Sequence, residues 1–201
     1  MGKAANLGKK RFSMVKQRHK ETFNEAVEKN LADEKMVSLC NFVASTKNFF
    51  TSSGCAGRIL LIQLPKGESK REASFHRRWH TTVFFEEVKQ AVEEKTAGEL
   101  WLKMEPFILH IGSNTIENAR KILGIMSKSG IKRGGIIVAK PGKFLVEMQG
   151  TQEMSVPLKQ EDKVLVEDTY LQWLVQKANS KMQKNDEMRN RFEKECRRSL
   201  K

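Results

Sequence analysis

The 201-residue chain lacks the features that mark several large classes of protein. No apolar run approaches the roughly 18 residues that predict a membrane span, and the basic N-terminus lacks the apolar stretch of a secretory signal. The three cysteines, Cys40, Cys55 and Cys196, are an odd number without a CxxC spacing, which argues against a disulfide framework. We therefore expect a protein of the reducing cytoplasm that does not enter a membrane.

Common cofactor and metal signatures are missing as well. Neither the GxGxxG dinucleotide fingerprint nor the P-loop pattern occurs in the chain. A zinc site could be drawn from His76, His80, His110 and Cys55, but no CxxC or HExxH spacing supports it. The sequence therefore predicts no metal.

Positive charge is abundant. Lysine and arginine total 37 against 24 acidic residues, which gives a net charge of +13 and a pI near 9.8. Such a charge favours a polyanionic partner because it neutralises phosphates and releases counterions. A soluble basic protein without such a partner is the alternative. Arg133, beside a predicted hairpin, and the basic face of the last helix are candidates for a surface that follows phosphates.

The order of predicted elements indicates an α+β fold. Residues 1–12 predict a flexible basic arm, and residues 13–201 predict a single catalytic domain that ends in a long helix. Helices are expected at 13–30, after caps at Asp33 and Asn114, from Thr82, and from Asp168. Strands are expected near 49–50, 58–63, 75–81, 100–104, 107–111, 136–139, 143–148, 156 and 164–166. Because strands and helices mix without strict alternation, a helical layer packed on a sheet is expected.

The stretch "FFTSSGCAGRILLIQL", residues 49–64, carries a small polar segment before an apolar run. Its glycines allow a close approach of the backbone to a ligand, and Arg58 adds a cation that suits a phosphate or carboxylate. A tight turn between strands explains the glycines equally well. Cys55 is either a nucleophile activated by Arg58 or a small, partly buried thiol.

Two further segments combine polar and aromatic side chains. Residues 75–80, "FHRRWH", interleave cations, imidazoles and an indole, which suits stacking on a base and holding a phosphate. A sheet edge with one packed tryptophan is the alternative. Glu105 and His110 stand at the two ends of a short predicted strand, and either could act as a general acid or base. A structural histidine is the alternative there.

Several segments in order are similar to the tRNA wybutosine-synthesising protein 3 family. They are "FFTSSGCAGRILL", "RRWH", "MEPFILHI", "SGIKRGGI", "VPL" and "YLQWLVQKANSKMQKNDEMRNRF". The resemblance implies an S-adenosylmethionine-dependent methyltransferase that methylates N4 of a tricyclic base beside the anticodon of tRNA(Phe). It also implies a fold unlike the usual Rossmann-like methyltransferase, in agreement with the missing glycine fingerprint.

The resemblance carries site roles onto matching positions of this chain. His80 or His110 is implied as the proton acceptor, and Trp79 as a stacking partner for the base or the adenine. The loop with Arg58 would hold the methionine carboxylate of the cofactor or a tRNA phosphate, and the sequence leaves both open. The cofactor- or substrate-binding residues implied are Ser52, Ser53, Cys55, Gly57, Arg58, Trp79, Glu105, Pro106, Asn179 and Lys181, and Arg133 joins this set from the basic surface beside the hairpin.

The chain departs from the family pattern at two glycines. Gly54 stands where the family usually has serine before the loop cysteine, and Gly134 stands where serine is common. If the missing hydroxyl at 54 contacts a ligand, Ser53 must substitute for it. Gly54 therefore keeps open a non-catalytic tRNA-binding module on the same fold. A thiol enzyme built on Cys55 is the third hypothesis.

Overall fold

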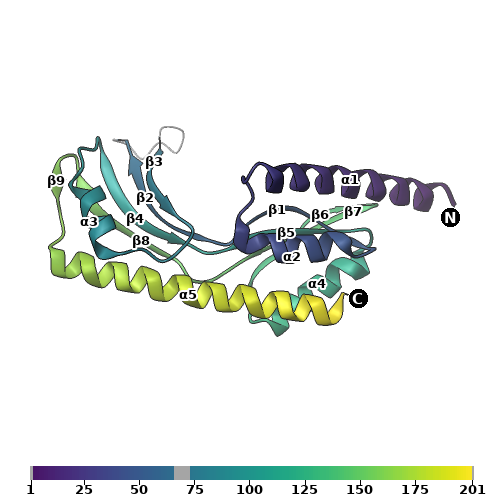
Figure 1. Ribbon diagram of the computed structural model, residues 1–201. Coiled ribbons are helices and arrows are strands. Elements are labelled where there is room, and N and C mark those ends of the chain that lie inside the picture. Colours follow the sequence, from purple (N-terminus) through teal and green to yellow (C-terminus); the bar gives the residue numbers. More distant parts are fainter. Residues whose placement is uncertain (1, 66–72, 201) are drawn as a thin grey trace. The chain divides into compact units, whose positions relative to one another are not determined.

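The computed structural model describes residues 2–65 and 73–200 and confirms the α+β class. These residues form five helices and nine strands, which Figure 1 labels in chain order. The helices are α1 (Gly2–Glu28), α2 (Glu34–Ser45), α3 (Phe85–Glu93), α4 (Ile116–Lys128) and α5 (Asp168–Ser199). The strands are β1 (Phe49–Cys55), β2 (Arg58–Leu64), β3 (Ser74–Trp79), β4 (Glu99–Glu105), β5 (Ile108–Ser113), β6 (Arg133–Lys140), β7 (Lys143–Gln149), β8 (Met154–Gln160) and β9 (Lys163–Val164).

The chain divides into two compact units, each with its own sheet and core. Unit 1 comprises Met1–Ala56, Phe107–Thr151 and Glu187–Lys201, and unit 2 comprises Gly57–Pro106 and Gln152–Asp186. Every described strand pairing is antiparallel, so the predicted absence of a Rossmann-like parallel sheet is confirmed. A single catalytic domain over 13–201 stays a prediction, and the units are described separately.

Unit 1 is built on a four-stranded sheet in the order β1-β5-β7-β6. Its core joins apolar residues of these strands to one face each of α2, α4 and the last part of α5. Phe192 of α5 and Leu39 of α2 are both fully buried there. Helix α1 packs on Phe50 of β1, whose ring stacks on His19 with centroids 5.1 Å apart. Gly112 leaves room for that ring, because a Cβ would lie 2.0 Å from Phe50 Cζ.

Unit 2 is built on a five-stranded sheet in the order β3-β2-β4-β8-β9. Alternate residues of β2 and β4, such as Ile59, Leu61 and Leu102, face a core that α3 and the first part of α5 complete. Asn179 of α5 fixes the entry to α3, since its amide accepts from Val83 N at 2.9 Å and donates to Val83 O at 2.8 Å.

The N-terminal segment differs from the expected arm. Helix α1 begins at Gly2 rather than Ser13, and Phe12 is buried with its ring centroid 5.9 Å from that of Phe50. The predicted boundary at residue 12 therefore falls inside a helix. The sequence missed this because the apolar residues that dock the helix, such as Phe12, are few among many lysines and arginines.

Two other local predictions were wrong. The segment predicted as a loop after Phe50 continues as β1 to Cys55, with an irregular register between Thr51 and Ser53 that leaves Ser52 as the extra residue of a bulge. Helix α4 is capped by Thr115, whose side chain accepts from Asn118 N, and not by Asn114 as predicted. Within the described residues, no helix combines the length and the apolar character that a membrane crossing requires.

Candidate functional site

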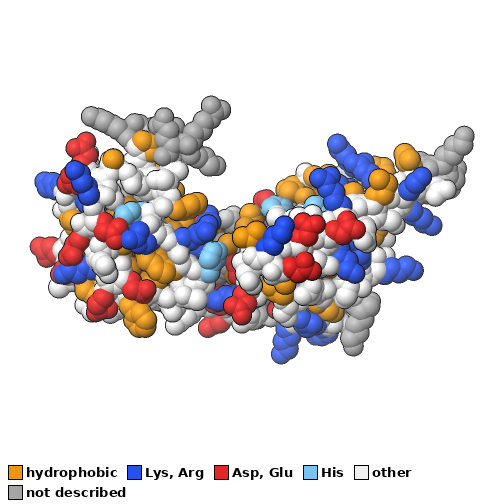
Figure 2. Space-filling model, turned by 45° about the horizontal axis from the view of Figure 1, so that its top comes forward, with side chains coloured by type: hydrophobic (Ala, Val, Ile, Leu, Met, Phe, Trp, Pro, Cys, Tyr) orange, Lys and Arg blue, Asp and Glu red, His pale blue; other side chains and the backbone are white. Residues whose placement is uncertain are grey.

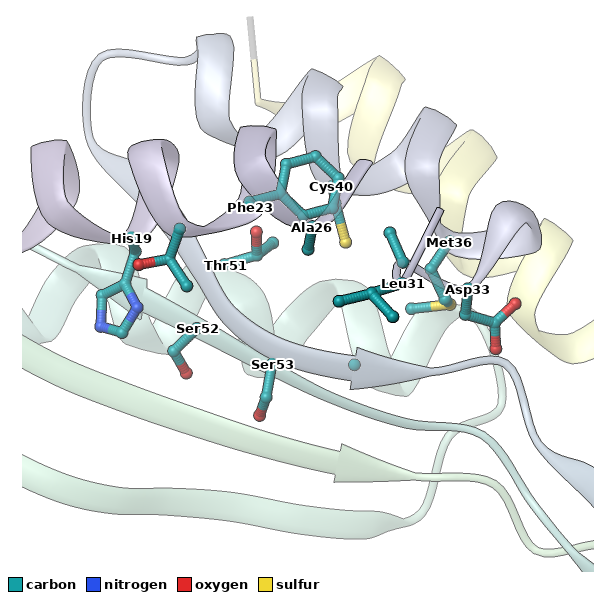
Figure 3. A pocket seen from close by; sticks show the side chains of 13 residues that line it. His19, Phe23, Ala26, Leu31, Asp33, Met36, Cys40, Thr51, Ser52 and Ser53 are labelled. Atoms are coloured by element: carbon teal, nitrogen blue, oxygen red, sulfur yellow. The ribbon is translucent and has the colours of Figure 1, made fainter. Parts of the chain in front are cut away.

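A pocket of about 230 Å³ lies in unit 1 against the polar part of β1. Thr51, Ser52, Ser53 and Gly54 line it from the strand, and residues of α1, α2 and the turn between them line it from the other sides. Figure 3 shows His19 and Ser52 toward one end and Asp33 at the other, with apolar side chains between. Those apolar walls are Phe23, Ala26, Leu31, Ala32, Met36 and Cys40. The bulge at Ser52 explains how four consecutive residues reach one pocket.

Asp33 is the only carboxylate that lines this pocket among the described residues. Its Oδ1 accepts from Lys35 N at 3.2 Å as the N-cap of α2, and its Oδ2 accepts from Ala56 N at 2.7 Å. One side chain thus fixes both the start of α2 and the end of the β1 segment. Sequence analysis found Asp33 only as a helix cap.

A line of hydrogen bonds crosses three strands beside the pocket. Ser53 Oγ lies 2.7 Å from His110 Nδ1, and His110 Nε2 lies 2.7 Å from Glu147 Oε2. The register explains the line, because β5 places His110 opposite both Ser53 of β1 and Glu147 of β7. An ionised carboxylate can only accept, so Nε2 carries the proton and Nδ1 of a neutral ring accepts from the serine hydroxyl. This order of groups can draw a proton from Ser53 toward His110.

Burial shifts the pKa of two further ionisable groups that line the pocket. It lowers the pKa of His19, with Lys143 and Arg18 adding to the shift, so this imidazole is neutral at pH 7. It also raises the pKa of Cys40 to about 11, because an uncharged thiol is favoured away from water. His19 is therefore a second possible proton acceptor, and Cys40 is an unreactive wall of the pocket.

Arg58, Gly57, Glu105 and Pro106 lie in unit 2, whereas the serines and the cysteine of the same predicted loop lie in unit 1. Arg58 Nε donates to Glu105 Oε2 at 2.7 Å, and the two residues are directly paired across β2 and β4. Gly57, with φ of 97°, and buried Pro106 precede and follow these strands. The predicted cation is thus held by the predicted carboxylate, and either could change partner when a ligand arrives.

The other predicted residues of unit 2 are divided among its elements. Trp79 packs partly on the core and lines a small polar pocket of about 180 Å³ with Arg77 and Glu94, and half-buried His80 follows β3. The amide of Asn179 is hydrogen-bonded to the backbone of Val83. Lys181 lies two residues further along α5 and is half-buried. A ligand role for each of these residues stays a prediction.

Of the predicted residues, the structure brings Ser52, Ser53, Cys55 and His110 together on β1 and β5. Arg133 is on β6, at the opposite edge of that sheet, so it does not join them. Sequence reasoning missed Glu147. A carboxylate in the middle of the strand pattern "KFLVEMQ", between buried Val146 and Met148, was the available signal.

The chain is similar to known proteins over nearly its whole length. A family model described as "Methyltransferase TYW3" matches residues 9–198. A relative from Thermococcus sibiricus, named tRNA(Phe) 7-((3-amino-3-carboxypropyl)-4-demethylwyosine(37)-N(4))-methyltransferase, is 33% identical over 94% of this chain and 96% of its own. The tRNA wybutosine-synthesizing protein 3 homolog of Mus musculus is 34% identical over 82% of this chain and 65% of its own.

Two solved structures are similar to this chain over most of its length. The PH1069 protein from Pyrococcus horikoshii matches with a TM-score of 0.87 and 29% identity, over 92% of this chain and 96% of that one. A hypothetical protein from Aeropyrum pernix matches with a TM-score of 0.72 and 26% identity, over 84% and 99%. With a family model that spans nearly all of its residues and relatives above 30% identity, the chain belongs to the Methyltransferase TYW3 family.

Proposed function

We propose that this chain transfers a methyl group from S-adenosylmethionine to N4 of the 7-(3-amino-3-carboxypropyl)-4-demethylwyosine base of tRNA(Phe), in the anticodon arm. Membership of a methyltransferase family over residues 9–198 is the observation that carries the proposal. It favours a catalytic protein over the non-catalytic tRNA-binding module. The net charge of +13 supports an RNA substrate, and Figure 2 shows lysine and arginine side chains exposed on the visible surface of both units.

The unit 1 pocket is the proposed cofactor site. Its apolar walls, including Phe23, Leu31 and Met36, suit the adenine ring and the methionine chain. Asp33 at one end offers carboxylate oxygens to ribose hydroxyls or to an ammonium group. The hydroxyls of Ser52 and Ser53 can bind polar atoms that lie along β1. We therefore assign binding to these β1 and α1–α2 residues, and Arg58 to a phosphate or carboxylate of either ligand.

The proposed proton path runs along Ser53, His110 and Glu147. When bound, S-adenosylmethionine supplies a methyl group on a sulfonium, and its displacement by nitrogen needs no covalent enzyme intermediate. The nitrogen must lose a proton, and Ser53 Oγ can accept it while passing its own proton to His110 Nδ1. Glu147 then stabilises the imidazolium through the 2.7 Å bond to Nε2. His80, in unit 2, stays the alternative acceptor.

Positioning of the two reactants supplies a further part of the rate enhancement. Holding the nitrogen in line with the transferred methyl group is worth up to about 7–11 kcal/mol in favourable cases. β1 and β5 are suited to this task because antiparallel pairing on both sides of the bulge, rather than a free loop, holds their side chains. Cys55 needs no chemical role in this scheme.

A methyl-transfer assay with defined tRNA tests the proposal. The protein is incubated with S-adenosylmethionine that carries a labelled methyl group and with tRNA(Phe) that bears the demethylated precursor base. One methyl group per tRNA is expected, located at N4 by mass spectrometry of the nucleosides. The same tRNA without the aminocarboxypropyl group is the control and should stay unlabelled. Folded protein that binds neither the cofactor nor the tRNA by calorimetry would refute the proposal.

A further inference from the structure

The sheet of unit 2 has one face covered by helices and one that none of the unit's described helices covers. Helices α3 and α5 pack on the side chains of Ile59 and Leu61 in β2 and of Leu102 and Met104 in β4. Figure 1 shows both helices on the same side of β4 and β8 within this unit. Side chains alternate along a strand, so the residues between those core positions point to the other face. We call this second face the open face.

The open face carries an ordered set of aromatic and basic side chains. Phe75 of β3 and Trp101 of β4 flank Ile62 of β2, one on each side. Arg78 and Lys103 flank Leu60 in the same way, two residues along β2. We call Phe75, Arg78, Trp101 and Lys103 the open-face cluster. Two aromatic rings and two cations thus stand in adjacent rows of one sheet.

Distances within the cluster show that its cations lie against its rings. Arg78 Cζ is 5.6 Å from the centroid of the Phe75 ring, and Arg58 Cζ is 4.9 Å from the same centroid. Lys103 Nζ is 5.9 Å from the centroid of the Trp101 ring. These are cation–π distances, and Phe75 remains 51% exposed. Half of the Phe75 side chain is therefore accessible for a further stacking contact.

Two carboxylates share the open face and are already engaged. Glu105 accepts from Arg58 Nε, and Glu99 accepts from Trp101 Nε1 at 2.8 Å. Against these two acids stand the three cations Arg58, Arg78 and Lys103, so the face keeps a positive excess. Such a face attracts a polyanion, and its exposed rings can stack on flat bases.

We propose that the open face binds unpaired nucleotides of the RNA substrate. One base stacks on Phe75 and a second on Trp101, while Arg78 and Lys103 contact phosphates. Two strand spacings separate the two rings by about 10 Å, so they take two bases rather than stack on each other. Antiparallel sheets with exposed aromatic side chains bind single-stranded RNA in this manner in other folds. The inference rests on the proposed function only in taking tRNA as the partner.

Direct binding of RNA tests the open face without any need for catalysis. Fluorescence anisotropy compares an anticodon stem–loop of tRNA(Phe) with a blunt duplex of equal length, for the wild type, Phe75→Leu and Trp101→Leu. Each substitution should weaken stem–loop binding about 5- to 150-fold, the range for loss of one stacked base. Duplex binding should change little, because a duplex offers no free base.

Trp173→Leu is the matched control. Trp173 is also half-exposed, at 49%, and also has a lysine, Lys177, at 5.1 Å from its ring centroid. It lies on α5 and not on the sheet, so its substitution should leave stem–loop binding unchanged. An equal loss in Trp173→Leu, or equal losses for stem–loop and duplex in Phe75→Leu, would overturn the proposal. Wild-type affinity in Phe75→Leu and Trp101→Leu, with unchanged melting temperatures, would overturn it as well.

Salt dependence tests the two cations separately. Arg78→Gln and Lys103→Gln should each lower the slope of log K against log salt by about 0.7, as expected for one phosphate contact on a single strand. Lys177→Gln should leave the slope unchanged, and a reduced slope there but not at Arg78 and Lys103 would contradict the assignment. All variants should bind S-adenosylmethionine as the wild type does. Failure of cofactor binding or methyl transfer in the wild type would count against the proposed function alone, because the RNA-binding readout does not depend on either.

Discussion

Replacing Glu147 with glutamine tests the proton path most directly. The substitution keeps the shape of the side chain and removes its charge. In the wild type, the 2.7 Å contact to His110 Nε2 fixes the proton on that nitrogen and leaves Nδ1 free to accept from Ser53. A glutamine amide can donate as well as accept, so the imidazole can turn to the tautomer whose Nδ1 already carries a proton. That tautomer accepts nothing from Ser53.

The expected loss follows from the role of the base. General base catalysis contributes about 10²- to 10⁴-fold to a rate. Because the amide still accepts from Nε2 in part of the population, we expect a loss of about 10²- to 10³-fold in kcat, or about 2.7–4 kcal/mol of transition-state stabilisation. Folding should change by less than about 1 kcal/mol, since the Glu147 side chain is 39% exposed and its ion pair is partly solvated.

Single-turnover methyl transfer with saturating tRNA and cofactor measures this loss apart from binding. Glu86→Gln is the control, because Glu86 is exposed on α3 and its change removes the same charge from unit 2. Glu86→Gln should keep the wild-type rate. A wild-type rate in Glu147→Gln would refute the path through His110, and a rise in KM with unchanged kcat would make Glu147 a binding residue instead.

Three other expectations follow from unit 1. Cys55→Ser should keep near-normal turnover in the methyl-transfer assay, and loss of turnover would favour a thiol mechanism. Gly54→Ser should lower the free energy of unfolding by about 1–3 kcal/mol in urea, because the new Cβ would lie 3.0 Å from Cδ1 of buried Leu109 and 3.1 Å from Met36 Cε, and the tips of both side chains must shift; an unchanged free energy of unfolding would contradict this tight packing. The buried Cys40 thiol has a pKa of about 11, above its ordinary 9.0. The unfolded chain therefore loses this proton first, and stability should fall between pH 9 and 11 by about 1.4 kcal/mol per unit. Cys40→Ala should show a shallower fall in urea unfolding over that range, and an equal slope would contradict the assignment.

Periodicity predicted most of the secondary structure because it reports burial directly. The solid apolar run after Arg58 is β2, buried within the unit 2 sheet, and the alternation from Leu100 to Met104 is β4. Helix α1 and strand β1 were harder, since their partners are distant in sequence. Phe12 is one aromatic residue in a basic segment. It is buried because it packs on Phe50, a contact that the local sequence pattern does not reveal. "TSSGC" has turn composition, yet pairing with β5 holds it as a strand.

The candidate site was predicted in its residue types and not in its geometry. Sequence placed Ser53 and His110 in one set, because each belongs to a segment shared with a known family. It could not add Glu147, since a hydrogen bond across β5 and β7 depends on register, and register is set by the packing of two strands. It also treated Asp33 as a cap alone, although the same carboxylate accepts from Ala56 at the far end of the β1 segment.

For Arg58, the sequence predicted a cation that suits a phosphate or carboxylate of a ligand, and the structure adds a partner within the protein. Arg58 is tied to Glu105 through Nε and lies over the ring of Phe75. The hydrogen bond through Nε leaves the two terminal nitrogens of the guanidinium as donors. Glu105 can therefore orient the guanidinium while these two nitrogens donate to a phosphate. In this arrangement Glu105 orients Arg58, and its role as an acid or base stays a prediction. If the open face binds RNA as proposed, this pair orients a third cation beside the open-face cluster, and sequence spacing alone could not assign Glu105 to Arg58 as its partner.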